Sequence, residues 1–295
     1  MAVSIFSIVV LYKTDLNIFK QILAAHLNNF SNAILVNNSQ EVSLESLKST
    51  KVTIINNQTN IGLAAALNVG IIEAKKQGAK MVALFDQDSH IPANYSRDMM
   101  QYINNYHGSK PIAVYSSIYH NHVVDERAKL INFKPFRLIR ESVIEDQNYA
   151  HPHYMITSGS VIPISVFDDV GLMREELFID FVDIEWCLRA RAKGYNIVAI
   201  NKVIIDHHLG DYAVNIMGHH YPIHSPIRMY YYFRNSIYLY RLGGIDWNWR
   251  FVDSSRNLFR FLFYMLFVKN RPTYFKYIIK GYYHGFINKM GKLEE

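Results

Sequence analysis

The chain has 295 residues, 50% of them hydrophobic and 19% charged, which is the composition of a folded protein with a large core and excludes a disordered one. Its one cysteine, Cys187, excludes an internal disulfide framework and a multi-thiolate zinc site, so we expect a reducing, cytoplasmic compartment. The formal net charge of +6 resides in residues 250–295, which hold nine basic and three acidic residues and favour an anionic surface as partner.

The chain starts with an apolar stretch, residues 1–12, that lacks the basic leader and the small-residue cleavage site of a secretory signal. We expect this stretch to form a buried first strand. The longest apolar run near the other end, residues 258–268, contains Arg260 and is far shorter than the roughly 20 residues that cross a bilayer. The sequence therefore predicts no membrane span.

Residues 4–88 alternate between short β-branched runs and helix-patterned stretches. This alternation predicts an α/β fold with a mostly parallel, Rossmann-like central sheet and helices on both faces. Ligands of such sheets bind beyond the carboxyl ends of the strands, where this sequence places polar residues. The predicted strands cover residues 5–11, 33–36, 52–55 and 81–85, and the clearest helices cover residues 16–27 and 62–77.

The pattern becomes mixed after residue 91. We expect a helix from Pro92 to about Tyr106, and a loop rich in histidine and glycine over residues 206–225. The aromatic, basic segment from Trp247 onward is predicted to be a separate helical module. Further strands are expected near residues 112–116 and 157–163, and further helices over residues 184–193 and 227–242.

Asp86, Gln87 and Asp88 follow the predicted strand 81–85 directly, so two carboxylates lie at the carboxyl edge of the sheet. Hard oxygen ligands on a short turn suit Mg²⁺ or Mn²⁺ bridging to a diphosphate. The alternative is a solvated loop in which an aspartate caps the helix that begins near Pro92. The preceding strand favours the metal site.

A second acidic cluster, residues 180–186, places Asp180, Asp183 and Glu185 beside aromatic residues. Desolvation by the aromatic rings would raise the pKa of a carboxyl group and let it act as a general base. The plainer alternative is a helix N-terminus enriched in acids that match its dipole.

The other polar signals are individually weak. His207 and His208 follow a predicted strand and could complete a metal site, and adjacent histidines leave open which of them binds. A glycine at Gly159 would permit close approach of a ligand to the backbone. Arg234 could bind a diphosphate bidentately, although a surface arginine on an amphipathic helix is the simpler interpretation.

Taken in order, these stretches resemble glycosyltransferase family 2, which has the GT-A fold, and within it the rhamnosyltransferases of surface polysaccharide assembly. The resemblance covers roughly residues 4–242. It rests on residues 60–70 (NIGLAAALNVG), 85–88 (FDQD), 158–160 (SGS), 183–189 (DIEWCLR), 207–210 (HHLG) and 232–235 (YFRN).

The resemblance implies a catalytic domain over residues 1–245, with a donor half (1–90) and an acceptor half (91–245). The aromatic residues of 246–295, with Arg256 and Arg260 four apart and Lys276 and Lys280 four apart, predict amphipathic membrane-associating helices with cations at anionic headgroups. Asp183 would be the general base, and Asp88, Asp86 and His207 would hold Mg²⁺ or Mn²⁺. The nucleotide-sugar donor would contact Tyr12, Asn37, Asn38, Asn60, Gly62, Asn68, Asp86, Gln87 and Arg234. The acceptor would contact Ser158, Gly159, Ser160, Glu185 and Trp186.

Two positions depart from the family pattern. Asn37 stands where the family often has Asp, which makes the preference for one nucleotide base less secure. Val182 stands where a Glu precedes the catalytic Asp, while the position of Asp183 still fits.

The implied activity is transfer of a sugar with inversion, most simply L-rhamnose from dTDP-β-L-rhamnose, to a glycan on a polyprenyl diphosphate. The enzyme would lie peripherally on the inner face of the cytoplasmic membrane through its C-terminal helices, and it could be a homo-oligomer. Open alternatives are a UDP-sugar donor, a nucleotidyltransferase and a non-catalytic membrane-surface scaffold. A nucleotidyltransferase would need a glycine-rich loop after the first strand, which residues 10–15 lack, and the apolar C-terminal run disfavours nucleic acid as partner.

Overall fold

The computed structural model describes residues 4–121, 126–206, 212–216 and 219–294. Within them, a nine-stranded sheet runs in the order β3-β2-β1-β4-β10-β5-β11-β9, with β6 paired to β5. β6, β9 and β10 are antiparallel to their neighbours and the other pairs are parallel. The strands are β1 (Ile5–Leu11), β2 (Asn32–Asn37), β3 (Val52–Asn56), β4 (Met81–Asp86), β5 (Ile112–Asn121), β6 (Glu126–Arg127), β9 (Tyr149–Ala150), β10 (Ser160–Pro163) and β11 (Asn196–Asp206).

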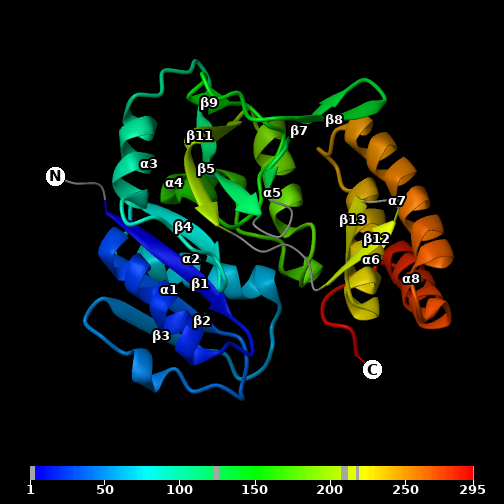
Figure 1. Ribbon diagram of the computed structural model, residues 1–295, viewed down its shortest axis with the longest axis horizontal. Coiled ribbons are helices and arrows are strands. Elements are labelled where there is room, and N and C mark those ends of the chain that lie inside the picture. The colour runs from blue at the N-terminus through cyan, green and yellow to red at the C-terminus, as the bar shows by residue number, and fades with distance from the viewer. Residues whose placement is uncertain (1–3, 122–125, 207–211, 217–218, 295) are drawn as a thin grey trace.

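Helices cover both faces of this sheet (Figure 1). Successive side chains of a strand point to opposite faces, and the core divides accordingly. Val9 and Leu35 pack with α1 and α3, whereas Ile8 and Ile34 pack with α2, α4 and α5. The predicted α/β fold is confirmed. The helices are α1 (Leu16–Asn29), α2 (Leu63–Lys76), α3 (Tyr95–Asn104), α4 (Ile164–Val170) and α5 (Val182–Ala192), with short 3₁₀ turns η1 (Glu45–Leu47) and η2 (Glu175–Leu177).

Three further helices stand beside the sheet: α6 (Pro226–Arg241), α7 (Trp247–Phe267) and α8 (Arg271–Phe286) (Figure 1). Gly281 and Gly285 let α8 approach α6 closely, because a Cβ on Gly281 would lie 2.5 Å from the carbonyl oxygen of Tyr230. No helix in the described part of the chain is both long and apolar enough to span a membrane. Two hairpins complete the fold: β7 (Leu130–Lys134) with β8 (Arg137–Glu141), and β12 (Tyr212–Ile216) with β13 (His219–Ile223).

Candidate active site

The ends of β1 and β4 are joined by Gln87. Its Oε1 accepts a hydrogen bond from the backbone N–H of Tyr12 at 2.8 Å, and its Nε2 donates to the Tyr12 carbonyl at 3.3 Å. The Tyr12 side chain is exposed. Gln87 therefore fixes the loop after β1 beside the Asp86–Asp88 turn, and the exposed Tyr12 ring is available to a ligand there.

Asn37 and Asn38, expected at the nucleotide base, are buried and already hydrogen-bonded. Asn37 Nδ2 donates to the Val42 carbonyl at 2.8 Å. Asn38 Nδ2 donates to Asn60 Oδ1 at 3.0 Å, and Asn38 Oδ1 accepts from the Ile61 N–H at 3.0 Å. These amides shape the loops after β2 and β3, so their geometry supports a framework role around a donor pocket.

The N-terminal end of α2 lies against the loop that follows η2. Gly62 has φ +89, and a Cβ there would lie 2.5 Å from Phe178 Cδ2, so only glycine fits. The Leu63 N–H donates to the Phe178 carbonyl at 2.6 Å. Asn68 is buried deeper, where its side chain bonds both the N–H and the carbonyl of Met173 at 2.9 Å. Gly62 and Asn68, which were expected at the donor, thus connect α2 to the segment that leads to Asp183.

The segment Ser158–Gly159–Ser160 lies beside the Asp86–Asp88 turn and contacts it through Ser158. The two serines are buried. Ser158 Oγ accepts from the Asp86 N–H at 3.5 Å and lies 2.5 Å from Ser89 Oγ. Gly159 has φ +81, and a Cβ would collide with the Ser117 side chain. The segment expected to bind the acceptor therefore braces the acidic turn.

Asp183 lies in the first turn of α5, half-buried, with two backbone contacts. Its Oδ2 accepts from the Thr157 N–H at 3.3 Å and its Oδ1 from the Ile184 N–H at 2.8 Å. Burial is the main cause that raises the pKa of Asp183 to about 6, and repulsion from the nearby Asp86 carboxylate contributes to this rise. The fold thus brings together Asp86 and Asp183, which are far apart in the sequence, and gives Asp183 the pKa of a general base at neutral pH.

The backbone leading to Asp183 adopts an unusual conformation. Phe178, Asp180 and Phe181 have φ values of 64, 63 and 66, a left-handed conformation that residues other than glycine rarely adopt. Asn235 Nδ2 donates to the carbonyls of Leu177 at 2.9 Å and Ile179 at 2.8 Å, and it also bonds the Asp180 carbonyl. One buried amide of α6 therefore holds the strained segment in place.

Arg234, expected at the donor diphosphate, is fully buried. Its Nη2 donates to the Leu177 carbonyl at 2.9 Å and the Glu176 carbonyl at 3.2 Å, and its guanidinium lies 4.9 Å from the centre of the Tyr231 ring. The guanidinium is thus occupied within the protein, and a diphosphate would have to displace these bonds. The structure gives Arg234 a place in the support of the 176–181 segment.

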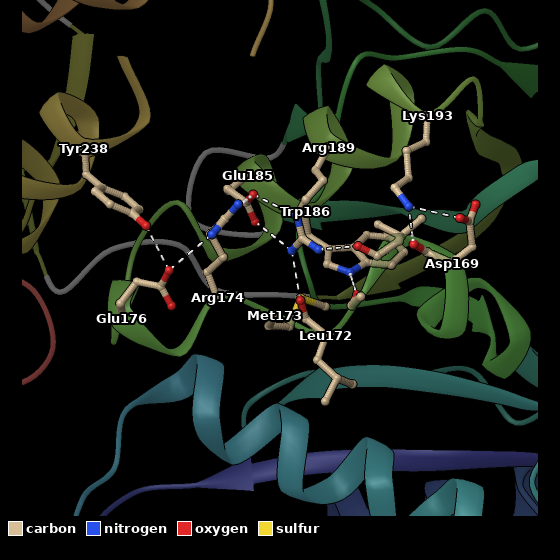
Figure 2. A network of polar contacts seen from close by, with 12 residues as sticks. Asp169, Leu172, Met173, Arg174, Glu176, Glu185, Trp186, Arg189, Lys193 and Tyr238 are labelled. Carbon is tan, nitrogen blue, oxygen red and sulfur yellow. Dashed lines mark hydrogen bonds and ion pairs between the residues drawn. The ribbon is translucent and has the colours of Figure 1, made fainter. Parts of the chain in front are cut away.

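Glu185 and Trp186, expected to touch the acceptor, are buried in a polar network (Figure 2). Glu185 Oε1 accepts from Arg174 Nε and from Arg189 Nε, each at 2.8 Å. Trp186 Nε1 donates to the Gly171 carbonyl at 2.8 Å. This geometry joins α5 to the ends of α4 and η2, and leaves neither side chain facing a ligand.

The metal site can be tested in part. Asp86 and Asp88 are half-buried carboxylates on one turn. The Asp86 carboxylate is close enough to Asp183 to raise the pKa of that residue. Two carboxylates plus substrate phosphates are a usual Mg²⁺ environment, so these residues fit a divalent cation. In the described residues, no three His, Cys, Asp or Glu side chains form a metal cluster. His207 and His208 lie outside those residues.

Comparison with known proteins decides the family. Residues 8–171 match the model of glycosyl transferase family 2. The chain belongs to this family. It is 32% identical over 246 residues to the dTDP-rhamnosyl transferase RfbF of Shigella flexneri, covering 82% of this chain and 81% of that protein. The protein is therefore a glycosyltransferase of the rhamnosyltransferase-like kind, as its sequence motifs indicate.

Solved structures share the fold at low identity. S. aureus TarS aligns with a TM-score of 0.59 and 14% identity, over 96% of this chain and 80% of that one. GalNAc-T7, solved with UDP, GalNAc and Mn²⁺, aligns with a TM-score of 0.58 and 12% identity, over 86% of this chain and 54% of its own length. These likenesses support the GT-A arrangement of the family.

The sequence did not reveal two contributors to the site. Thr157 contributes only its backbone N–H, which no side-chain pattern can indicate. Asn235 follows Arg234 in the family-like stretch 232–235, and this position was the only indication in the sequence that its side chain contributes to the site.

Proposed function

We propose that this glycosyltransferase transfers L-rhamnose from dTDP-β-L-rhamnose to a glycan hydroxyl, with inversion at the anomeric carbon. The observation that carries the donor assignment is the 32% identity, over most of both chains, to a protein named as a dTDP-rhamnosyl transferase.

The chemistry is assigned to Asp183. Because its pKa is about 6, the carboxylate is mostly ionised at neutral pH and is more basic than an ordinary aspartate. It takes the proton from the acceptor hydroxyl as that oxygen bonds to C1 of the sugar. The bond from C1 to the β-phosphate oxygen breaks at the same time, and the nucleoside diphosphate leaves with the electron pair.

Asp88 and Asp86 are the residues that would hold the divalent cation, with His207 or His208 as the further candidate ligand. When bound, the cation offsets the negative charge that develops on the departing diphosphate. Metal dependence is supported by the carboxylate pair at the end of β4 and by its approach to Asp183.

We further propose that the acceptor glycan is carried on a polyprenyl diphosphate in surface polysaccharide synthesis. The exposed aromatic residues and cations of α7 and α8 support an acceptor that resides at a membrane. A lipid carrier would present the acceptor hydroxyl to an enzyme bound at the same surface.

A donor screen tests the proposal. Purified protein is incubated with dTDP-β-L-rhamnose, UDP-GlcNAc and UDP-glucose, and release of nucleoside diphosphate is measured with Mg²⁺ and with excess chelator. We expect release from dTDP-rhamnose alone and its loss in chelator. Preference for a UDP-sugar would refute the donor, undiminished release in chelator would refute the metal, and inactivity with every donor and acceptor would favour a scaffold.

A further inference from the structure

We propose that α7, α8 and the tip of the β7–β8 hairpin form one bilayer-binding face, which takes a lipid surface rich in anionic headgroups. Figure 1 shows this hairpin reaching over the N-terminal end of α7. The hairpin is an addition to the C-terminal helices that the sequence indicates.

The middle of α7 has inverted polarity. Asp253 and Asn257 are only 3% and 2% exposed, and both bond the Tyr240 hydroxyl at 2.8 Å. The guanidinium of Arg260 lies 4.0 Å from the centre of the Tyr232 ring. Polar side chains therefore point inward here, the reverse of an ordinary surface helix.

This arrangement corrects one sequence expectation. The spacing of Arg256 and Arg260 predicts two cations at lipid headgroups. Arg260 is instead occupied against Tyr232, and Arg256 is half-buried close enough to influence Asp253. The cations available to headgroups come from other positions.

The outward side of α7 is apolar, and the hairpin extends it. Trp247 and Phe251 stack on each other, and Phe136 at the hairpin tip contacts both rings edge-on. Phe136 and Trp247 are each 63% exposed. Further exposed apolar residues recur at helical spacing on each helix: Leu258, Phe259, Leu262 and Leu266 on α7, and Phe275, Ile279, Tyr283 and Phe286 on α8.

Charge identifies the occupant. Between residues 247 and 293 the sequence contains one acid, Asp253, and its side chain is buried. The exposed charges between residues 247 and 293 are therefore cations, including Lys269, Arg271 and Lys276, while the exposed Asp246 and Glu294 flank this stretch. A second copy would bring like charges together, whereas anionic headgroups complement the cations while the apolar residues enter the acyl region.

The first test uses the tryptophans as reporters. Trp186 and Trp249 are buried, at 1% and 2% exposure, so Trp247 is the tryptophan that senses a new environment. We expect vesicles containing phosphatidylglycerol to shift its emission to shorter wavelength, and brominated lipid to quench it. Unchanged emission with these vesicles would overturn the proposal.

The second test uses variants in vesicle flotation without donor or acceptor, so it is independent of the sugar. Phe136→Ser, Phe251→Ser and Phe259→Ser combined should weaken partitioning by at least about tenfold, because each removes an aromatic side chain from the interface. Ile72→Ser, which removes an exposed apolar residue of α2, is the matched control and should bind like the parent.

Circular dichroism checks that each variant is folded. Equal partitioning of the triple variant and the parent would overturn the proposal. So would a concentration-dependent dimer, seen by light scattering, that the triple substitution dissociates while vesicles bind neither form.

Discussion

Asp183 is a carboxylate held where its charge is disfavoured. Its folded pKa of about 6 exceeds the ordinary value of 3.8, so the folded state holds the proton more tightly than the unfolded state. Stability therefore falls as pH rises from about 4 to about 6, and above that range the ionised group destabilises the fold. This is the sign expected of a residue kept for chemistry.

Replacing Asp183 with Asn should lower turnover by about 10² to 10⁴-fold, since the base is removed. The same change should raise the free energy of unfolding at pH 7 by up to roughly 3 kcal/mol, with the gain vanishing near pH 4. Donor affinity should hardly change. Turnover of the parent should rise as pH passes about 6.

Kinetics, donor binding and denaturant unfolding on one variant check these expectations, with Asp169→Asn at the surface as control. Near-normal turnover of Asp183→Asn would contradict the base assignment. Loss of donor binding would instead place Asp183 at the diphosphate or metal.

His26 offers a second residue-scale prediction. It is fully buried among Phe30 and Phe85, neither ring nitrogen has a hydrogen-bond partner, and burial lowers its pKa to about 3. The folded state binds its proton less tightly than the unfolded state, so its neutral form gives full stability above about pH 6.5. That stability is lost as pH falls toward 3.

We expect His26→Leu to remove this loss and make the protein more stable than the parent at pH 5, as measured by thermal unfolding across pH. The exposed His107→Gln is the control and should leave the pH profile unchanged. Parallel profiles for His26→Leu and the parent would show that His26 does not control acid stability.

At the scale of elements, the buried strands were predictable because apolar periodicity records which faces are covered. β1 was predicted over its observed range, Ile5–Leu11. α3 was expected from Pro92 and instead begins at Tyr95, whose N–H donates to the Pro92 carbonyl in a preceding turn. The antiparallel insertion of β10 between β4 and β5 was not predictable. A four-residue apolar strand does not indicate which strands it pairs with or in which direction.

The 176–181 segment shows why part of the site escaped prediction. Nothing in its sequence indicates left-handed Phe178 and Phe181, because the conformation is imposed by Asn235 on another element. Asn235→Ala should remove the donor that bonds the Ile179 and Asp180 carbonyls and so displace Asp183, lowering turnover by roughly 10²-fold with a smaller effect on donor KM.

The neighbouring Ser236→Ala is the matched control, because Ser236 bonds the Phe233 carbonyl and the Tyr240 side chain, both on its own helix. Thermal unfolding measured beside the kinetics separates positioning from global damage. If Asn235→Ala keeps normal turnover, the clamp does not position Asp183.

At the scale of the whole molecule, the order of the family-like motifs along the chain predicted that Asp86, Asp88 and Asp183 belong to one site. Asp86 and Asp183 do approach each other, since β4 is a central strand and the chain returns to its end after the long excursion through β5 and β10. Glu185, Trp186 and Arg234 carried the same family signal but serve the framework. A family motif therefore indicates which residues belong to one functional region. The burial of each side chain then shows whether it can contact a ligand.

The residues after α8 return to the segment that precedes Asp183. The Gly291 N–H donates to the Glu176 carbonyl at 2.9 Å, Arg234 donates to the Gly291 carbonyl, and the Leu293 N–H donates to the Tyr231 hydroxyl at 2.8 Å. A truncation before Gly291, made to remove the exposed apolar helices α7 and α8 during purification, would also remove these bonds. Detergent or lipid discs should thus preserve turnover better than trimming, and an affinity tag belongs at the N-terminus.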